Sequence, residues 1–549
     1  MSIRIYLLVN FLIILTFIVG CQTSTEKRAD TSAVDDSLFI TGAFFQGANG
    51  IYFDDQDQLH VASVVSRLIG IVDTETGAII DTLDQKDGVE GPDDLTFGPD
   101  GSLYYTSILT GEVGRISPDG QAKRQFLSPG ANPITFSDDG RLFVALDFQG
   151  DGLYELDPNL ENEPRLIIKE LGWLNAMDFG PDGYIYGPIW SKGHIVKIDV
   201  DSGELEVIVD DLQTPAAVKF NSKGELFTVD HQSGIVYRID LNNRSKQAIA
   251  RGFVGADNIA FNSKDELFLA HAQDGSIHQI YMDGKTRTII PPALCNAADL
   301  EFINGQIIAP DILSMKQFEA GTGRLSKVWP HMIGGNGIIG PFTIDHEDGK
   351  LAMTSWFGNE VQVWDLENNE AVSTDHDYMV PINAILANES LIVAELGTTP
   401  GAAKVTRTIG NYKEVLMDAS NGLIVPSGLA FANGSTYVAD FFQGIVIQVT
   451  ENDQLLDSPK PIINDLKQPE GLQIGTNSHL YIVETGGNRI VSINLKSNEL
   501  NVVKDDIQLG VTGPAGMPPT WKLSDITFDD EGHIYIPSDI ENKVYRFAL

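Results

Sequence analysis

The chain has 549 residues, of which 42% are hydrophobic, so it is long and apolar enough for two hydrophobic cores, and a disordered chain is excluded. Its 37 basic and 76 acidic residues give a formal net charge of -39 at pH 7. A charge of this sign repels phosphate backbones and anionic lipid surfaces, which argues against nucleic acid as a partner.

Residues 1–20 have the pattern of an export signal. An apolar run over 5–19 is too short for a stable spanning helix and ends in Ile18-Val19-Gly20-Cys21. This ending resembles a bacterial lipobox, which implies that Cys21 becomes the acylated first residue. Gln22 after it resembles the outer-membrane sorting pattern of two-membrane bacteria. A cleavage site that leaves Cys21 unmodified is the alternative.

Residues 21–37 are polar and without pattern, which predicts a tether. The expected location is therefore the cell envelope, with contact to the membrane only through the lipid. With Cys21 acylated, Cys295 is the remaining cysteine, so we expect no disulfide and a buried apolar role for Cys295.

A repeated unit follows the tether and is clearest over 91–120. A polar pair, Asp93 and Asp94, precedes an apolar run over 95–97, and a Gly-Pro-Asp-Gly turn leads to a second run over 103–106. A third run over 113–116 completes a meander of short strands.

Twelve such units can be indexed by the residue two before the first strand's first hydrophobe. These index positions are Asn49, Asp93, Asn132, Asn175, Ala216, Asp257, Ala298, Phe342, Asn383, Ser427, Glu470 and Asp525. Their spacing is 39 to 44 residues, and 55 before the last. A period of this length, made of strands and turns, is typical of β-propeller blades.

Propellers usually have four to eight blades, so twelve units predict an all-β fold of two six-bladed propellers, over 38–284 and 285–549. An apolar strand over 38–45 precedes the first unit, and the last unit ends one strand short. We expect rings closed by shared strands, with 38–45 closing the first and 286–290 closing the second. A single larger ring is the alternative.

Most index positions of the first ring carry side chains whose oxygens could bind a cation. The first strand of each blade lines the channel, so residues at its start converge on one mouth. In the first ring these donors are Asn49, Asp93, Asn132, Asn175 and Asp257. Oxygen-only ligands with two carboxylates suit calcium or magnesium, so we predict a divalent-cation site there.

The second mouth is predicted to be acidic. Its index positions include Asn383, Glu470 and Asp525, and the second strands, which run back to the same mouth, end at Glu395, Asp440 and Glu484. Crowded carboxylates raise one another's pKa, so they bind a cation or act as acid and base. A polar channel without chemistry is the alternative for either ring.

One histidine, His271, falls at a mouth position of the first ring. We expect His271 or Asp257 to transfer protons there. A hydrogen-bonded structural histidine is the alternative.

The units GPDDLTFGPDGSLYYTS, LNAMDFGPDGYIYGP, PSGLAFANGSTYVAD and PEGLQIGTNSHLYIVET carry a family resemblance. Residues 38–549 resemble tandem propellers of the senescence-marker-protein, gluconolactonase and luciferin-regenerating-enzyme-like superfamily, which neighbours the NHL, strictosidine-synthase-like and streptogramin-lyase-like propellers. The resemblance implies lactonase activity with calcium or zinc held by Glu, Asn and Asp at the starts of inner strands. In this chain Asn175 and Asp93 lack the family's following glycine, and Asn49 stands where the family has an E-x-P motif.

Two classes of function follow from these patterns. One is a divalent-metal-dependent hydrolase of lactones or small esters. The other is a binding module for a small-molecule ligand or an envelope protein. A lyase of cyclic esters is a third option.

Overall fold

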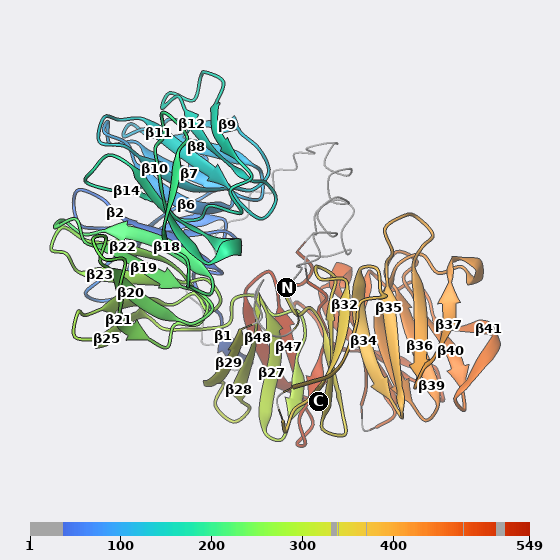
Figure 1. Cartoon of the computed structure of the whole chain (residues 1–549). Coiled ribbons are helices and arrows are strands. Elements are labelled where there is room, and N and C mark those ends of the chain that lie inside the picture. Colours follow the sequence, from blue (N-terminus) through green and yellow to red (C-terminus); the bar gives the residue numbers. More distant parts are fainter. Residues whose placement is uncertain (1–36, 331–337, 339, 369, 476, 512–521) are drawn as a thin grey trace. The chain divides into compact units, whose positions relative to one another are not determined.

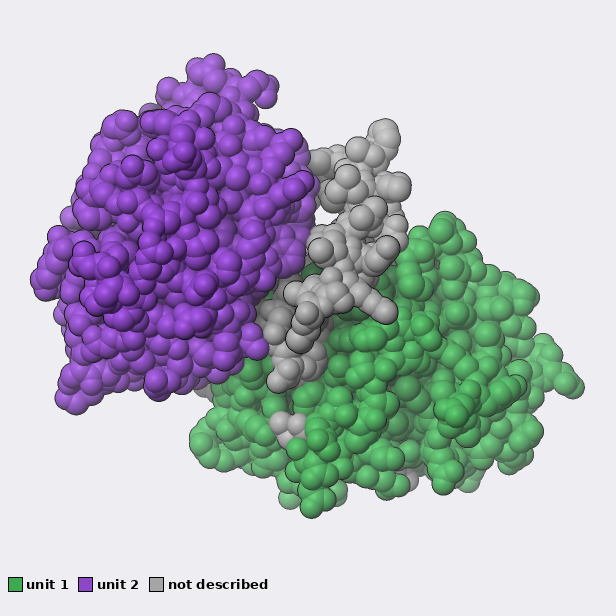
Figure 2. Space-filling view, in the orientation of Figure 1, with its two compact units in different colours: residues 1–42, 296–549 green, residues 43–295 purple. Residues whose placement is uncertain are grey.

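The computed structural model describes residues 37–330, 338, 340–368, 370–475, 477–511 and 522–549 (Figure 1). Their regular structure is antiparallel sheet, arranged as twelve four-stranded sheets. The chain divides into two compact units (Figure 2), which we call the first propeller (43–295) and the second propeller (residues up to 42, with 296–549). The predicted fold of tandem all-β propellers is confirmed.

The predicted signal peptide, Cys21 and all but the last residue of the predicted tether lie outside the described residues. Within the described part of the chain, no helix has the length and hydropathy to cross a bilayer.

Each sheet of the first propeller is built from four consecutive strands. Sheet by sheet, the strands are β2 (Ala48–Phe53), β3 (Leu59–Ser63), β4 (Leu68–Val72), β5 (Ile79–Leu83); β6 (Pro92–Phe97), β7 (Leu103–Ser107), β8 (Glu112–Ile116), β9 (Ala122–Phe126); β10 (Ala131–Phe136), β11 (Leu142–Leu146), β12 (Gly152–Leu156), β13 (Arg165–Lys169); β14 (Asp178–Phe179), β15 (Ile185–Ile189), β16 (His194–Ile198), β17 (Leu205–Val209); β18 (Pro215–Phe220), β19 (Leu226–Asp230), β20 (Ile235–Ile239), β21 (Lys246–Arg251); and β22 (Ala256–Phe261), β23 (Leu267–His271), β24 (Ile277–Ile280), β25 (Thr286–Ile290). Two short 3-10 helices, η2 (Gln85–Asp87) and η3 (Trp190–Lys192), lie between strands.

The second propeller repeats this plan in its first five sheets. Its strands are β26 (Glu301–Ile303), β27 (Gln306–Asp311), β28 (Ser314–Glu319), β29 (Leu325–Pro330); β30 (Ile344–Glu347), β31 (Lys350–Ser355), β32 (Glu360–Asp365), β33 (Glu370–Asp375); β34 (Pro381–Ala387), β35 (Ser390–Glu395), β36 (Lys404–Ile409), β37 (Tyr412–Asp418); β38 (Pro426–Ala432), β39 (Ser435–Asp440), β40 (Ile445–Glu451), β41 (Gln454–Ile463); β42 (Pro469–Ile474), β43 (His479–Glu484), β44 (Arg489–Asn494), β45 (Leu500–Lys504); and β46 (Thr527–Phe528), β47 (His533–Ser538), β48 (Lys543–Ala548) with β1 (Leu38–Thr41). The 3-10 helices here are η4 (Ala419–Asn421) and η5 (Thr485–Gly487).

The strand before the first repeat, β1, belongs to the second propeller. It pairs antiparallel with β48, so that Leu38 lies opposite Tyr545 and Thr41 opposite Lys543. β25 instead completes the sixth sheet of the first propeller by pairing with β24. The predictions for both closing strands are therefore wrong. The two units divide between Cys295 and Asn296, and not after residue 284.

The edges of the sheets explain this pairing. The chain end supplies three strands to the last sheet, which leaves β48 with an open edge that β1 fills, whereas every sheet within 43–295 already has four strands. The first propeller closes through side chains instead. Phe53 and Phe268, from its first and sixth sheets, have ring centroids 4.9 Å apart, and Ser263 N–H donates to Asp57 Oδ1 at 2.8 Å.

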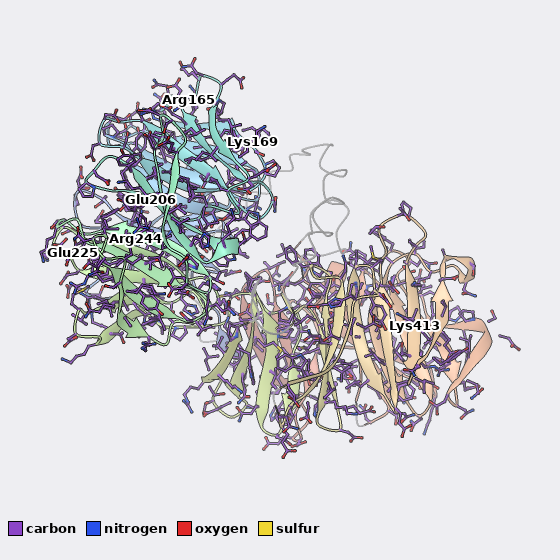
Figure 3. All side chains as sticks on the ribbon, in the orientation of Figure 1. Arg165, Lys169, Glu206, Glu225, Arg244 and Lys413 are labelled. Carbon is purple, nitrogen blue, oxygen red and sulfur yellow. The ribbon has the colours of Figure 1, made fainter. Side chains whose placement is uncertain are left out.

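The cores lie between neighbouring sheets. The second strands are apolar on both faces because each sheet is sandwiched between two others, and β7, β11 and β19 are buried along their whole length. The outermost strands are exposed and carry charges; Glu206 of β17, for example, forms an ion pair with Arg244 of the loop before β21 (Figure 3). Exposed pairs of this kind contribute only about 0.2–1 kcal/mol each.

A β-bulge sets the direction of many index residues. In β6 and β7, Pro92 lies opposite Ser107 and Leu95 opposite Tyr105, so that two residues face one. Corresponding register shifts occur at the starts of β2, β10, β18, β22, β34, β38 and β42. Because a bulge re-aims a side chain, these strand starts are suited to building a site.

Candidate functional site

Four of the five predicted cation ligands of the first propeller are the second residues of inner strands, namely Asn49, Asp93, Asn132 and Asp257. Asn175 precedes β14 by three residues. Asp93, Asn132 and Asn175 are buried, with exposed fractions of 3%, 7% and 4%. Asn49 and Asp257 are partly exposed. The charge of Asp257, which belongs to a different blade, raises the pKa of Asp93. That the five side chains share one cation stays a prediction.

The sequence analysis did not select Asp147, a further buried carboxylate of the first propeller. It follows β11 directly, one residue beyond the counted end of the second strand, and is fully buried. Asn132 Nδ2 donates to its Oδ2 at 2.7 Å, while Oδ1 accepts no hydrogen bond from the described residues. A buried carboxylate oxygen without a hydrogen-bond donor costs about 1–3 kcal/mol, so Asp147 Oδ1 is available to a partner.

Burial and mutual repulsion raise the pKa of all three carboxylates. Burial, then the charge of Asp257, raises the pKa of Asp93 well above its usual range, and burial, then Asp93, does the same for Asp147. Burial and then Asp94 raise the pKa of Asp257 to about 7, which the Asn49 amide partly opposes. A cation among them would relieve this repulsion.

A second group of charged residues in the first propeller includes a lysine, Lys219. Asp94 Oδ2 accepts from Ile134 N–H of the neighbouring blade at 3.1 Å, and Asp178 Oδ2 accepts from Phe220 N–H at 2.9 Å. The Lys219 ammonium lies 3.9 Å from Asp178 Oδ1 and lowers the pKa of both carboxyl groups against the larger effect of burial. These residues join adjacent blades, and Lys219 offsets one of the two negative charges.

His271 is held within its own blade. Its Nε2 lies 2.9 Å from the Val254 carbonyl oxygen, and its Nδ1 lies 3.2 Å from Asp274 Oδ1. His231, one residue after β19, is a further buried histidine of this propeller, and its ring packs against Trp190 with centroids 5.0 Å apart. Its Nδ1 lies 2.7 Å from the Ala256 carbonyl oxygen. The proton-transfer role of His271 stays a prediction.

The acidic residues predicted for the second mouth serve two purposes. Glu395, Asp440 and Glu484 each accept backbone N–H groups of the loop that enters their own blade, from Met379, Ile424 and Lys467 respectively. Glu470 Oε2 likewise accepts from Ser524 N–H at 2.8 Å. These carboxylates anchor loops, which is why strand-end counting found them in a regular series.

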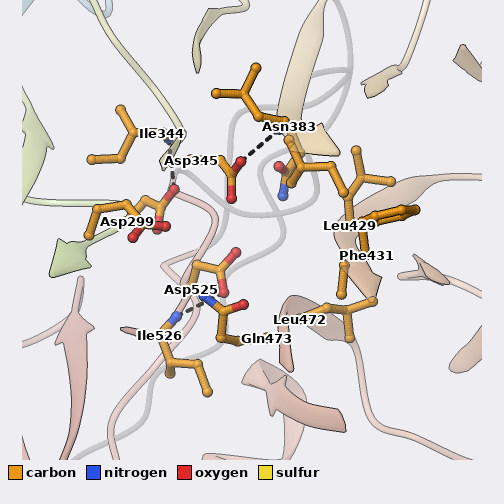
Figure 4. Close-up of a pocket in the computed structure, with 14 residues that line it drawn as sticks. Asp299, Ile344, Asp345, Asn383, Leu429, Phe431, Leu472, Gln473, Asp525 and Ile526 are labelled. Atoms are coloured by element: carbon orange, nitrogen blue, oxygen red, sulfur yellow. Dashed lines mark hydrogen bonds between the residues drawn. The ribbon is translucent and has the colours of Figure 1, made fainter. Parts of the chain in front are cut away.

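Asn383 and Asp525 of the predicted set line a cavity of about 60 Å³ (Figure 4). Three carboxylates that the sequence analysis did not select, Asp299, Glu301 and Asp345, line it as well. They follow the index positions by one or three residues, so a second count along each inner strand would have found them.

Elsewhere in the described residues, one set of three acidic or histidine side chains has ligand atoms within 4.8 Å of one another, namely Asp529, Glu531 and His533. It lies in the hairpin between β46 and β47, where His533 Nδ1 is 2.8 Å from Asp529 Oδ2. The central carboxylates of both propellers are more widely spaced than this. A cation bound between them would therefore also need amide oxygens or water.

Comparison with known proteins places these sites in context. Residues 97–302 match the family model described as SMP-30/Gluconolactonase/LRE-like region. No curated protein matches the sequence.

Several solved structures are similar. Virginiamycin B lyase from Staphylococcus aureus is 14% identical, with 56% of this chain and 92% of that chain covered and a TM-score of 0.24. PorZ, a surface component of the type-IX secretion system of Porphyromonas gingivalis, is 10% identical over 92% and 86% of the two chains, with a TM-score of 0.38. The extracellular domain of a one component system from B. thetaiotaomicron is 11% identical over 93% and 82%, with a TM-score of 0.32.

The matched residues 97–302 cover most of the first propeller and end just inside the second. They carry the buried Asp147, and all the predicted donors except Asn49 and Asp93. The predicted resemblance to the SMP-30/gluconolactonase/LRE-like propellers is thereby confirmed.

Proposed function

We propose that the first propeller is a divalent-cation-dependent hydrolase of lactones or related small esters. The observation that carries the proposal is Asp147 Oδ1, a buried carboxylate oxygen without a hydrogen-bond donor among the described residues, beside Asp93. The oxygen-only donor set suits calcium or magnesium.

Asp93 and Asp147, with the amide oxygens of Asn132 and Asn175, are the residues that would hold the cation. Asn132 donates through its nitrogen to Asp147, which leaves its oxygen for a ligand. Asn175 Oδ1 accepts from Ala176 N–H at 2.7 Å and retains a second lone pair. When bound, a divalent cation supplies a Lewis acid that polarises an ester carbonyl.

Asp257 is the group proposed to take the proton from the attacking water. It is partly exposed, and its pKa of about 7 matches a general base that works near neutrality. Hydrolysis adds one water across the acyl–oxygen bond, and Asp257 then returns the proton to the leaving alkoxide.

The experiment compares lactone and ester hydrolysis by the purified chain after chelation and after return of Ca²⁺ or Mg²⁺. Asp93→Asn should abolish cation binding and turnover together. Asp257→Asn should abolish turnover, while Glu163→Gln, which removes an exposed charge from the same propeller, should leave both unchanged.

Turnover that survives chelation, or Asp93→Asn protein with full activity, would overturn the proposal. A product that keeps the substrate's mass, rather than gaining water, would indicate a lyase of cyclic esters. Retained cation binding without turnover of any tested ester would favour a binding module.

We also propose that the protein is anchored in the cell envelope by acylation of Cys21, as the lipobox pattern Ile18 to Cys21 predicts. Cys21→Ser should release the chain from the membrane fraction and remove the lipid mass. Membrane association of the variant without any lipid would contradict this.

A further inference from the structure

A groove of about 380 Å³ lies between the fourth and fifth sheets of the second propeller. Phe441 and Phe442, in the loop after β39, form one wall. Leu466, Lys467 and Gln468, which precede β42, form the other wall. The volume exceeds the roughly 300 Å³ at which small-molecule pockets begin. The groove is therefore large enough for a ligand with one or two rings.

An aromatic side chain lies open on the wall of this groove. The side chain of Phe442 is 68% exposed, the highest fraction among the large apolar side chains of the described residues. Within the described part of the chain its ring contacts one other ring, that of Phe441, with centroids 5.3 Å apart. The remaining surface of the Phe442 ring is available to a ligand.

The first propeller shows what can cover a phenylalanine in this position. Phe148 is the second residue after β11, as Phe442 is the second residue after β39. The Phe148 ring contacts the rings of Trp173 and Trp190, and both centroid distances are 5.4 Å. Two indole rings thus pack against Phe148, whereas no ring from another blade packs against Phe442 among the described residues.

The backbone identifies the residues of the second propeller that correspond to these tryptophans. Trp173 and Gln468 each lie two residues before an index position, and both have positive φ, 69° and 52°. Trp190 and Thr485 each begin a 3-10 helix directly after a second strand. Trp190 N–H donates to the Trp173 carbonyl oxygen at 2.9 Å, and Thr485 N–H donates to the Gln468 carbonyl oxygen at 3.1 Å. The second propeller therefore has Gln and Thr where the first has two indole rings.

The groove also has a positive charge. Lys467 is exposed, and its ammonium group has no hydrogen bond or ion pair to a described residue. The nearby Glu484 is already engaged, because it accepts from the Lys467 backbone N–H at 2.6 Å and forms an ion pair with Arg489. The exposed Asp465 does not line the groove, and no other carboxylate does. In a chain with a net charge of -39, this groove is suited to an anion.

We propose that this groove binds a small planar aromatic molecule that carries a carboxylate. The ring occupies the space that the tryptophans fill in the first propeller and packs against Phe442, and the carboxylate pairs with the Lys467 ammonium group. The groove shares no lining residue with the central cavity of the second propeller, and it is independent of the hydrolysis proposed for the first.

The test uses indole-3-propionate and uncharged indole as probes, whose binding to the full chain is measured by ligand-observed NMR. Phe442→Ala should weaken the binding of both by about tenfold, because the ring contact is lost. Lys467→Gln should weaken indole-3-propionate alone, by about threefold. Phe357→Ala is the matched control, since Phe357 is another exposed phenylalanine of the same propeller, and it should change neither affinity.

A fourth variant fills the groove from within the chain. Gln468→Trp places an indole where the first propeller has Trp173, whose backbone has the same positive φ, and should abolish the binding of both probes. No saturable binding of indole-3-propionate to the wild type, or wild-type affinity in folded Phe442→Ala and Gln468→Trp chains, would overturn the proposal. Tighter binding of the peptide Gly-Trp-Asp than of indole-3-propionate would overturn it in favour of a partner polypeptide.

Discussion

The buried His231 should make the first propeller sensitive to acid. Burial, the largest influence, lowers the pKa of its imidazole to about 3, against an ordinary value of 6.5. The unfolded chain therefore takes up a proton below about pH 6.5, while the folded chain resists it. Stability from this group is complete above pH 6.5 and falls as the pH falls toward the folded value.

The size of the effect follows from the two pKa values. Each pH unit between them costs about 1.4 kcal/mol, so acidification from pH 7 to pH 4.5 should remove about 2.5 kcal/mol through His231 alone. For a domain of this size that corresponds to about 5–10 °C in melting temperature. Other groups titrate over the same range, and the buried carboxylates with raised pKa act in the opposite direction.

His231→Asn isolates the histidine, because the asparagine nitrogen can still donate to the Ala256 carbonyl oxygen that lies 2.7 Å from Nδ1. Native-state hydrogen exchange in urea, read on peptides of β19 and β20, gives the unfolding free energy of the first propeller separately. The difference between wild type and variant should shrink by about 2.5 kcal/mol from pH 7 to pH 4.5. A difference that stays constant would show that His231 is protonated without penalty in the folded state, and would refute the reasoning.

Two further predictions concern the architecture. Removal of residues 37–42 should open the last sheet of the second propeller and leave the first propeller intact. Limited proteolysis should then leave a resistant fragment of about 43–295. Loss of the first propeller instead would contradict the observed pairing of β1 with β48. Gly428→Ala should lower the unfolding free energy of the second propeller by more than about 2 kcal/mol, because the new Cβ would lie 1.9 Å from the Glu470 carbonyl oxygen. In the control Gly321→Ala the new Cβ meets nothing within 4 Å. Its unfolding free energy in urea should stay within about 0.5 kcal/mol of the wild-type value. Equal stability of the two glycine variants would count against close packing of the inner strands.

Local patterns predicted the blades well because each is a meander whose turns and apolar runs are contiguous in the chain. Ring closure could not be predicted this way. The segments 38–41 (LFIT) and 286–290 (TRTII) are both short strand patterns. The open edge of β48, which is far away in the sequence, decides which of them leaves its neighbouring repeat.

The candidate site of the first propeller likewise combines residues that local counting selects with one that it does not. Asp93 and Asp257 were selected because they occupy index positions, whereas Asp147 lies one residue past a strand end, where the count stopped. In the second propeller, counting selected the loop anchors Glu395, Asp440 and Glu484. The cavity carboxylates Glu301 and Asp345 each lie three residues after an index position, which a count of the index positions alone does not select.

The pairing of β1 with β48 means that the first propeller is inserted within the second, which fixes an order of assembly. As the chain emerges from its N-terminus, all strands of the first propeller are present by residue 295. Its two ends are then joined by a hydrogen bond of 2.6 Å from the Ala43 N–H to the Leu294 carbonyl oxygen. The second must wait for the final residues while β1 remains an unpaired strand. That interval covers the emergence of residues 296–549. During it, β1 of one chain can pair with β48 of another, so strand-exchanged dimers are the characteristic misassembly to expect of this architecture.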